Sequence, residues 1–210
     1  MTDRSEAAWG GAWTPAWRAL GWTTVLTVLA ILVDTRVYHA VHDPKVYERD
    51  WGRMFRIMGF LGTWLALAIA VALQEGATEA RRALAKRRAG LLFWSATLGG
   101  LLAEVLKLII RRERPQAHDG EYGFRAFADQ PWSTSGLAMP SSHALVAFGG
   151  AAMLARLYPR ARWVGYVLAA GCGLTRVMAR GHFLRDVVMA AVLGWIVAFA
   201  LTRRWSPDEE

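Results

Sequence analysis

The sequence predicts an all-α integral membrane protein, a bundle of six transmembrane helices that forms one domain over residues 1–210. Three observations predict this class. Apolar residues make up 54% of the chain although 20% of it is charged, and they gather in stretches almost free of charge. There are also 11 Trp, a residue type enriched at membrane interfaces. The charge-poor stretches are residues 19–33, 57–73, 89–110, 144–155, 163–175 and 187–202.

The number of these stretches favours membrane helices over the buried helices of a soluble protein. A helix needs about 20 residues to cross a bilayer. Several stretches reach that length only if flanking polar residues, such as Asp34, Arg176 and Asp186, lie at the helix ends. Six apolar helices in one soluble chain of this length would leave too little amphipathic surface to cover them. We therefore predict six spans.

The segments between and beyond the stretches are predicted less specifically. Residues 1–18 and 203–210 are expected to be tails. The first tail has a Trp at every fourth position, which suits an interfacial helix, but its two Gly and one Pro equally suit a disordered segment. Residues 43–56 are predicted to form an amphipathic helix over the entrance to a site. Residues 116–139 form either a lid or a plain connecting loop.

The net charge of +8 is compatible with nucleic acid, anionic lipid or a phosphorylated substrate, and the placement of the charges decides among them. Five basic residues crowd the short joint at 81–88. Because short basic loops remain in the cytoplasm, this joint and both termini are expected there. The localisation that follows is a multi-pass protein of the bacterial cytoplasmic (inner) membrane, without a nucleic-acid partner.

The polar residues at the ends of the stretches are candidates for function because hydrocarbon tolerates ionisable groups poorly. Successive spans run antiparallel, so the end of span 3, the start of span 4, the end of span 5 and the start of span 6 share one side of the membrane. This side faces the exterior in the predicted orientation. The residues gathered there are Lys107, Arg114, Ser141, His143, Arg176, His182 and Asp186.

The spacing of these residues suits the transfer of a phosphoryl group. Lys107 and Arg114 are seven residues apart, or two helical turns, so both cations are expected on one helix face, with Arg111 between them. Ser141 and Ser142 suit the N-terminus of a helix, where free backbone N–H groups and the helix dipole favour an oxyanion.

Two of the other candidates suggest a nucleophile. His182 and Asp186 lie one turn apart, so the carboxylate can hold the imidazole Nδ1–H and leave Nε2 free to attack. Each piece has an ordinary alternative: a snorkelling cation, a helix cap, an interfacial histidine or a structural hydrogen bond. These alternatives explain the residues singly but not jointly. A metal site is disfavoured, because the histidines lie on different helices without a third His or a Cys partner.

At this point the chain resembles the type 2 phosphatidic acid phosphatase superfamily. The family signature has three parts: K-x6-R-P, P-S-G-H and S-R-x5-H-x3-D. This sequence carries Lys107-x6-Arg114-Pro115, then Pro140-Ser141-Ser142-His143, then Thr175-Arg176-x5-His182-x3-Asp186. It departs from the signature twice. Thr175 replaces a Ser and keeps the hydroxyl, whereas Ser142 replaces a Gly and adds a side chain where the backbone would approach the phosphate.

The resemblance implies a metal-independent phosphatase without a cofactor that works through a phosphohistidine. His182 would be the nucleophile, Asp186 would orient it, and His143 would protonate the leaving oxygen. The remaining motif residues would hold the phosphoryl oxygens: Lys107, Arg114, Ser141, Ser142 and Arg176.

The function that we predict is therefore that of a membrane-embedded phosphatase acting on a lipid phosphate or pyrophosphate at the outer leaflet. Candidate substrates are a polyprenyl (pyro)phosphate, phosphatidic acid and phosphatidylglycerol phosphate, with undecaprenyl pyrophosphate slightly favoured by analogy. Two alternatives stay open, a lipid phosphotransferase using the same phosphoenzyme and a non-catalytic lipid-phosphate transporter. Membrane lipids are the other expected partners, and no pattern in the sequence indicates an oligomeric state.

Overall fold

The structure is a computed structural model that describes residues 5–203, with the backbone alone for residues 5–20, 22 and 23. The all-α prediction is confirmed: the described residues form seven α-helices, two 3₁₀ turns and no strand beyond isolated bridges. The helices are α1 (Ser5–Ala40), α2 (Asp50–Ile57), α3 (Leu61–Glu75), α4 (Glu79–Ile110), α5 (Ser142–Leu157), α6 (Arg162–Met178) and α7 (Leu184–Thr202).

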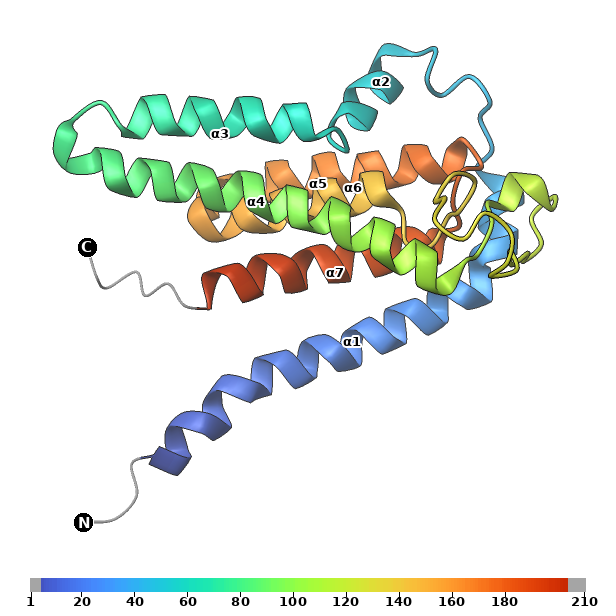
Figure 1. The fold of residues 1–210 in the computed structure, drawn as a ribbon, viewed down its shortest axis with the longest axis horizontal. Coiled ribbons are helices and arrows are strands. Elements are labelled where there is room, and N and C mark those ends of the chain that lie inside the picture. The colour runs from blue at the N-terminus through green and yellow to red at the C-terminus, as the bar shows by residue number, and fades with distance from the viewer. Residues whose placement is uncertain (1–4, 204–210) are drawn as a thin grey trace.

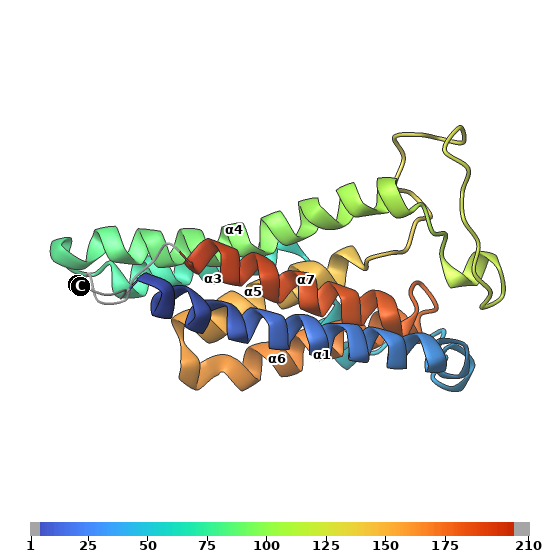
Figure 2. The ribbon, with the colours of Figure 1, turned by 90° about the horizontal axis from the view of Figure 1, so that it is seen from below.

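The long helices lie side by side along one axis, with α5 in the middle (Figure 1). Helix α5 packs against α4, α6 and α7, while α3 packs against α4, α2 against α6 and α1 against α7. The end of α4, the start of α5, the end of α6 and the start of α7 therefore lie at the same end of the bundle, as the sequence predicts. Figure 2 shows the long α4–α5 connection extending beyond the helices at this end. We call it the site end.

Two of the described helices, α4 and α7, are long and apolar enough to cross a membrane. A third candidate is the pair α2 and α3, which meet at an angle of 75°. Helix α5 is apolar but shorter, with 16 residues. The outer faces of the bundle carry exposed large apolar side chains, among them Leu32, Leu73, Ile109 and Trp163. Such a surface fits contact with lipid, and the number of six spans stays a prediction.

The helices approach one another closely at glycines. A Cβ atom on Gly194 of α7 would lie 2.7 Å from the backbone nitrogen of Gly149 on α5. A Cβ atom on Gly150 would lie 2.3 Å from the Trp64 ring of α3, which is itself fully buried. Small residues at these positions allow membrane helices to pack without a bulky side chain between their backbones. This packing fixes α5 relative to both neighbours.

Two segments differ from the sequence-based expectation. Helix α1 begins at Ser5, so most of the expected N-terminal tail has a helical backbone, while residues 1–4 and 204–210 lie outside the described part of the chain. The helix predicted over 43–56 begins only at Asp50. The reason is a turn at its start, where the Asp43 carboxylate accepts the Lys45 N–H at 3.0 Å and Pro44 follows Asp43.

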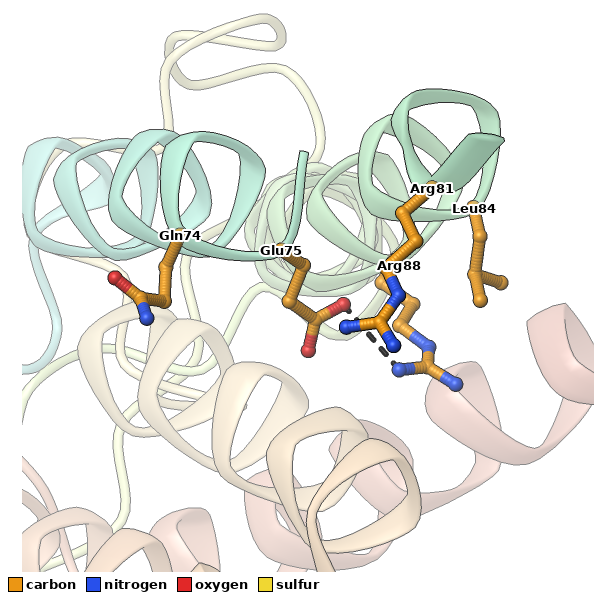
Figure 3. Close-up of a pocket in the computed structure, with 5 residues that line it drawn as sticks. All are labelled: Gln74, Glu75, Arg81, Leu84 and Arg88. Carbon is orange, nitrogen blue, oxygen red and sulfur yellow. Dashed lines mark hydrogen bonds and ion pairs between the residues drawn. The ribbon is translucent and has the colours of Figure 1, made fainter. Parts of the chain in front are cut away.

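At the end of the bundle opposite the site end, Glu75 connects three helices. Its carboxylate accepts the Tyr158 hydroxyl at 2.7 Å and forms an ion pair with Arg88 at 3.3 Å. Figure 3 shows Glu75, Arg88 and the nearby Arg81 around a cavity of about 430 Å³. These contacts connect α3, α4 and α5 beside the basic joint from which the orientation is predicted.

Candidate active site

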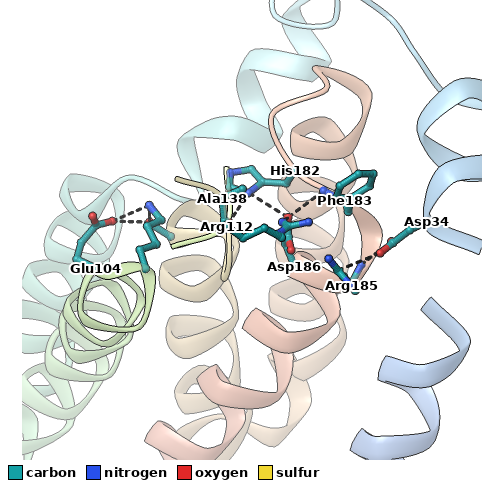
Figure 4. Close-up of polar contacts among 10 residues, drawn as sticks. Asp34, Glu104, Arg112, Ala138, His182, Phe183, Arg185 and Asp186 are labelled. Carbon is teal, nitrogen blue, oxygen red and sulfur yellow. Dashed lines mark hydrogen bonds and ion pairs between the residues drawn. The ribbon is translucent and has the colours of Figure 1, made fainter. Parts of the chain in front are cut away.

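His182 lies in the turn between α6 and α7 and is buried. Its Nδ1 lies 2.8 Å from the carbonyl oxygen of Ala138 (Figure 4). Because a carbonyl can only accept a hydrogen bond, the proton must be on Nδ1 and Nε2 must carry the lone pair. This turn is outside the helices, and burial lowers the pKa of His182 to about 4, an effect that Asp186 opposes. The imidazole is therefore neutral at ordinary pH.

Asp186 is in the first turn of α7, and its position corrects one expectation. Its Oδ2 accepts the Phe183 N–H at 2.9 Å and a hydrogen bond from Arg112, whereas His182 Nδ1 is 3.6 Å away. The carboxylate therefore caps α7 and pairs with Arg112, and the carbonyl of Ala138 holds the imidazole proton instead. At 3.6 Å, Asp186 acts on His182 through its charge.

Lys107 is buried near the end of α4. Its Nζ donates to Glu104 Oε1 at 2.9 Å and also to Ser142 Oγ. The Ser142 hydroxyl donates in turn to the same Glu104 oxygen at 2.5 Å. The three side chains connect α4 to the start of α5. Ser142, which replaces the Gly of the family signature, is thus hydrogen-bonded to α4 through its hydroxyl. It lies beside Lys107, a cation expected to bind phosphate.

Arg114 reaches the site from the α4–α5 connection. The seven-residue spacing predicted one helix through Lys107 and Arg114, but α4 ends at Ile110, and Arg111 has a left-handed backbone with φ of 57°. Arg111 therefore does not lie between Lys107 and Arg114 on one face. Its guanidinium donates instead to carbonyl oxygens of the connection, including those of Ala126 and Pro131. Arg111 organises the connection.

Arg176 is in the last turn of α6 and is buried, and it lines a cavity of about 440 Å³ together with Arg114. Its guanidinium donates to the Tyr47 hydroxyl at 2.9 Å. Burial and the charge of Arg176 both lower the pKa of Arg114. Neither arginine forms an ion pair with a carboxylate in the part of the chain that the structure describes.

Ser141 and His143 flank the first residue of α5. Ser141 is the N-cap, its N–H donates to the carbonyl of Asp186 at 3.3 Å, and its buried hydroxyl has no hydrogen-bond partner among the described residues. His143 is half-buried and lines an apolar cavity of about 370 Å³ with Phe60, Leu101 and Val146. The cavity lies between the starts of α3 and α5 and the second half of α4, and Glu104 and Ser142 also line it.

The predicted site residues are thus gathered at the site end from four segments of the chain. His182 interacts electrostatically with Arg176 and Lys107, and His143 interacts with the same two cations and with His182. No group of three or more His, Cys, Asp or Glu side chains within residues 5–203 is placed to hold a metal ion. The arrangement combines a neutral imidazole, a second histidine and three cations, which suits nucleophilic attack on a phosphoryl group.

Arg112 is a site residue that the sequence did not reveal. It is buried, its guanidinium lies 4.9 Å from the centre of the Phe183 ring, and it pairs with Asp186. Three arginines occur within four positions here, and no spacing distinguishes the one that meets Asp186. Which of the three arginines meets Asp186 depends on the residue at which α4 ends.

The chain belongs to the PAP2 superfamily, because the sequence profile of that family matches residues 88–209, more than half of its length. All eight predicted site residues lie within this match. The chain is 35% identical over 103 residues to a lipid A 1-phosphatase of Rhizobium johnstonii, and 34% identical over 103 residues to one of Rhizobium etli. Each match covers 49% of this chain and 42% or 44% of the relative, so it spans less than half the length of these curated relatives.

A solved structure is similar to the fold as a whole. It is the crystal structure of a transmembrane PAP2 type phosphatidylglycerolphosphate phosphatase from Bacillus subtilis, with a TM-score of 0.61. The similarity covers 92% of this chain and 100% of that one at 18% identity. The helices described above therefore have the arrangement of a transmembrane PAP2 protein, and the relatives point to a bacterial membrane protein.

Proposed function

We propose that the protein is a membrane-embedded lipid phosphatase in which His182 carries the phosphoryl group. One observation supports this role above the others. The bond from Nδ1–H to Ala138 leaves the lone pair on Nε2, in a buried turn with Lys107 and Arg176 close by. A neutral nucleophile among cations is the arrangement that an attack on an anionic phosphate monoester needs.

In the first step, Nε2 of His182 forms a bond to phosphorus as the bond between phosphorus and the lipid oxygen breaks. His143, protonated in the substrate complex, gives its proton to that oxygen, so the lipid leaves as an alcohol or, from a diphosphate, as a monophosphate. The imidazole of His182 becomes cationic, and the nearby Asp186 carboxylate stabilises it. Lys107, Arg114 and Arg176 balance the charge on the phosphoryl oxygens.

In the second step, water attacks the phosphorus of the phosphohistidine. His143, now neutral, accepts a proton from the water, the bond between nitrogen and phosphorus breaks, and inorganic phosphate leaves. The N–H groups at the start of α5 hold the phosphoryl oxygens through both steps. Because three cations supply the positive charge, we propose that the reaction needs neither a metal ion nor a cofactor.

The apolar cavity at His143 supports a lipid as the substrate. Its lining combines apolar side chains from α3, α4 and α5, and it ends at the proposed general acid. An acyl or prenyl chain can lie there while its phosphate meets the cations. The substrate class therefore includes polyprenyl (pyro)phosphates, phosphatidic acid and phosphatidylglycerol phosphate. The printed activities of the relatives, on lipid A and phosphatidylglycerolphosphate, belong to the same class.

We further propose that α1, α3, α4, α5, α6 and α7 are six spans of the bacterial cytoplasmic membrane. Helices α5 and α6 have 16 and 17 residues, and polar residues at their ends extend each toward spanning length. The basic joint at 81–88 would remain in the cytoplasm with both termini. The site end would then face the exterior, at the outer leaflet. Cysteine-labelling from outside the cell at Gln116 and at Lys86 tests this orientation: only the first position should react.

The test of the proposed chemistry is phosphate release by the purified protein in detergent, with EDTA present, from glycerolipid and prenyl phosphates. The wild type should release phosphate, and quenching in denaturant should trap an acid-labile phosphoenzyme. The variant His182→Ala should show neither. Retained turnover in His182→Ala would refute the assignment of the nucleophile. A lipid-phosphate transporter would tolerate His182→Ala while Arg114→Ala and Arg176→Ala removed its binding.

A further inference from the structure

The cavity lined by Arg114 and Arg176 contains more positive charge than one phosphoryl group needs. Its charged and aromatic lining consists of His42, Tyr47, Arg56, Arg114, Arg176 and Arg180, and we call it the arginine cavity. Its residues come from the α1–α2 connection, α2, the α4–α5 connection, the end of α6 and the turn between α6 and α7. Within the described part of the chain, no Asp or Glu lines it. Four guanidinium groups therefore surround about 440 Å³ without an acidic residue among them.

None of the four arginines is neutralised within residues 5–203, because none of them forms an ion pair with a carboxylate there. The Nε groups of Arg114, Arg176 and Arg180 are buried and have no hydrogen-bond partner among the described residues. Like charges gathered in a partly buried place repel one another, and buried donors without acceptors cost free energy. An anion in the cavity would relieve both costs.

Aromatic side chains, rather than acids, hold these arginines in place. The Tyr47 hydroxyl accepts from Arg176 and donates to the Thr175 carbonyl at 3.1 Å, and the Tyr47 ring lies 4.5 Å from the Arg56 guanidinium. The Arg180 guanidinium lies 4.7 Å from the Tyr38 ring. A cation stacked on a ring keeps its N–H groups available for another partner. Most N–H donors of these guanidinium groups therefore remain available for a ligand.

The reaction proposed above uses only part of this charge. A transferred phosphoryl group carries at most two negative charges, and Lys107, Arg114 and Arg176 meet it. Arg56 and Arg180 remain, and neither belongs to the three motifs. Arg56, like Tyr47 and His42, also lies outside residues 88–209, the part of the chain that the family profile matches. These residues therefore point to a feature of the substrate other than the transferred phosphate.

The location of Arg56 indicates which feature. Arg56 is three residues before Gly59, and a Cβ atom on Gly59 would lie 2.6 Å from the Cβ atom of His143, which gives its proton to the leaving oxygen in the proposed mechanism. The arginine cavity therefore lies on the side of the leaving group. A second anion bound there would belong to the part of the substrate that departs with the lipid.

We infer that the arginine cavity binds a second phosphate, carried on the leaving group, and that the preferred substrate is a lipid diphosphate. This inference rests on the proposed phosphatase function. The terminal phosphate is transferred to His182, while Arg56 and Arg180 hold the phosphate that stays on the lipid. As the bond between the bridging oxygen and the terminal phosphorus breaks, these arginines also balance the charge that develops on the departing phosphate. Inorganic phosphate from the medium is the other anion of the same chemistry that could occupy the arginine cavity.

The test compares a prenyl diphosphate with a prenyl monophosphate of the same tail. The variant Arg56→Gln/Arg180→Gln should lower the ratio of kcat/KM for diphosphate over monophosphate by about tenfold, mainly through KM of the diphosphate, with a much smaller effect on the monophosphate. Arg53→Gln is the matched control, since Arg53 is on α2 as well but pairs with Asp50. It should leave the ratio unchanged. An unchanged ratio in the double variant, or equal losses for both substrates, would overturn the inference.

A binding experiment separates this inference from the proposed function. The inactive His182→Ala protein is titrated with methylenediphosphonate and with inorganic phosphate. Tighter binding of the diphosphonate, abolished by adding Arg56→Gln and Arg180→Gln, supports the second phosphate subsite even if the wild type releases no phosphate. Equal affinity for the two anions would show that the cavity takes single phosphates only and would contradict the inference.

Discussion

The guanidinium group of Arg112 donates a hydrogen bond to the carboxylate of Asp186, and both side chains are almost completely buried. The pair joins the start of the α4–α5 connection to the first turn of α7, directly beside His182. Arg112 supplies the positive partner that the buried Asp186 carboxylate needs. The carboxylate then stabilises the cationic imidazole of the proposed phosphohistidine. In the proposed mechanism, Arg112 is thus a positioning residue for His182.

Replacing Arg112 should affect stability and turnover together. Arg112→Met leaves the Asp186 carboxylate buried without its partner, a change that costs about 3–5 kcal/mol in other buried pairs, so the melting temperature in detergent should fall. It should lower kcat far more than it changes KM, because Arg112 does not contact the phosphate in the proposed mechanism. Arg112→Lys should restore part of both. A raised KM with unchanged kcat would show instead that Arg112 binds the substrate.

Ser142 offers a test of the side chain that replaces the family's Gly. Its hydroxyl accepts one of the three ammonium hydrogens of Lys107. Both Ser142→Gly and Ser142→Ala should free that hydrogen for the phosphate and lower KM by about twofold to fivefold with little change in kcat. An effect in Ser142→Gly alone would show that the Cβ atom, not the hydroxyl, restricts the approach of the phosphate to the start of α5.

The all-α fold and the gathering of the candidate residues at one end of the bundle were predictable from the sequence, for a physical reason. Charge-poor stretches must be buried or in contact with lipid, and antiparallel order alone gathers four segments at one end. The details at helix ends were not predictable. Extending α4 by its period placed Arg111 beside Lys107, but the left-handed backbone of Arg111 ends the helix and turns its side chain into the connection. Which arginine meets Asp186 depends on that one residue.

The pH dependence of phosphoenzyme formation should reflect the buried position of His182. Its pKa is lowered to about 4, mainly by burial. Protonation removes the lone pair of Nε2, so attack is lost only as the pH falls through about 4, and not near 6.5 as for an exposed histidine. The value of kcat/KM reports on ionisations of the free enzyme. Between pH 5 and 7 it should therefore not fall with decreasing pH because of His182. An acidic limb near pH 6.5 that remains when His143 is replaced by Gln would contradict this prediction.

Asp34 connects α1 to the catalytic turn, although it lies outside the region that the family profile matches. Its buried carboxylate accepts the Arg185 backbone N–H at 3.0 Å and pairs with the Arg185 side chain at 3.3 Å (Figure 4). The Tyr122 hydroxyl donates to the same carboxylate at 3.4 Å. Arg185 immediately precedes Asp186, so this contact fixes the first turn of α7 against α1. The carboxylate therefore helps to set the position of Asp186 relative to His182.

The variant Asp34→Asn keeps the size of the side chain but removes the charge that neutralises Arg185. It should lower the melting temperature and reduce kcat by about tenfold, with KM nearly unchanged, because the cations that bind the phosphate are untouched. Asp50→Asn is the matched control and should change neither quantity, because Asp50 is an exposed carboxylate on α2 that pairs with Arg53. A loss of stability in Asp34→Asn without any loss of kcat would show that α1 supports the fold but does not position the nucleophile.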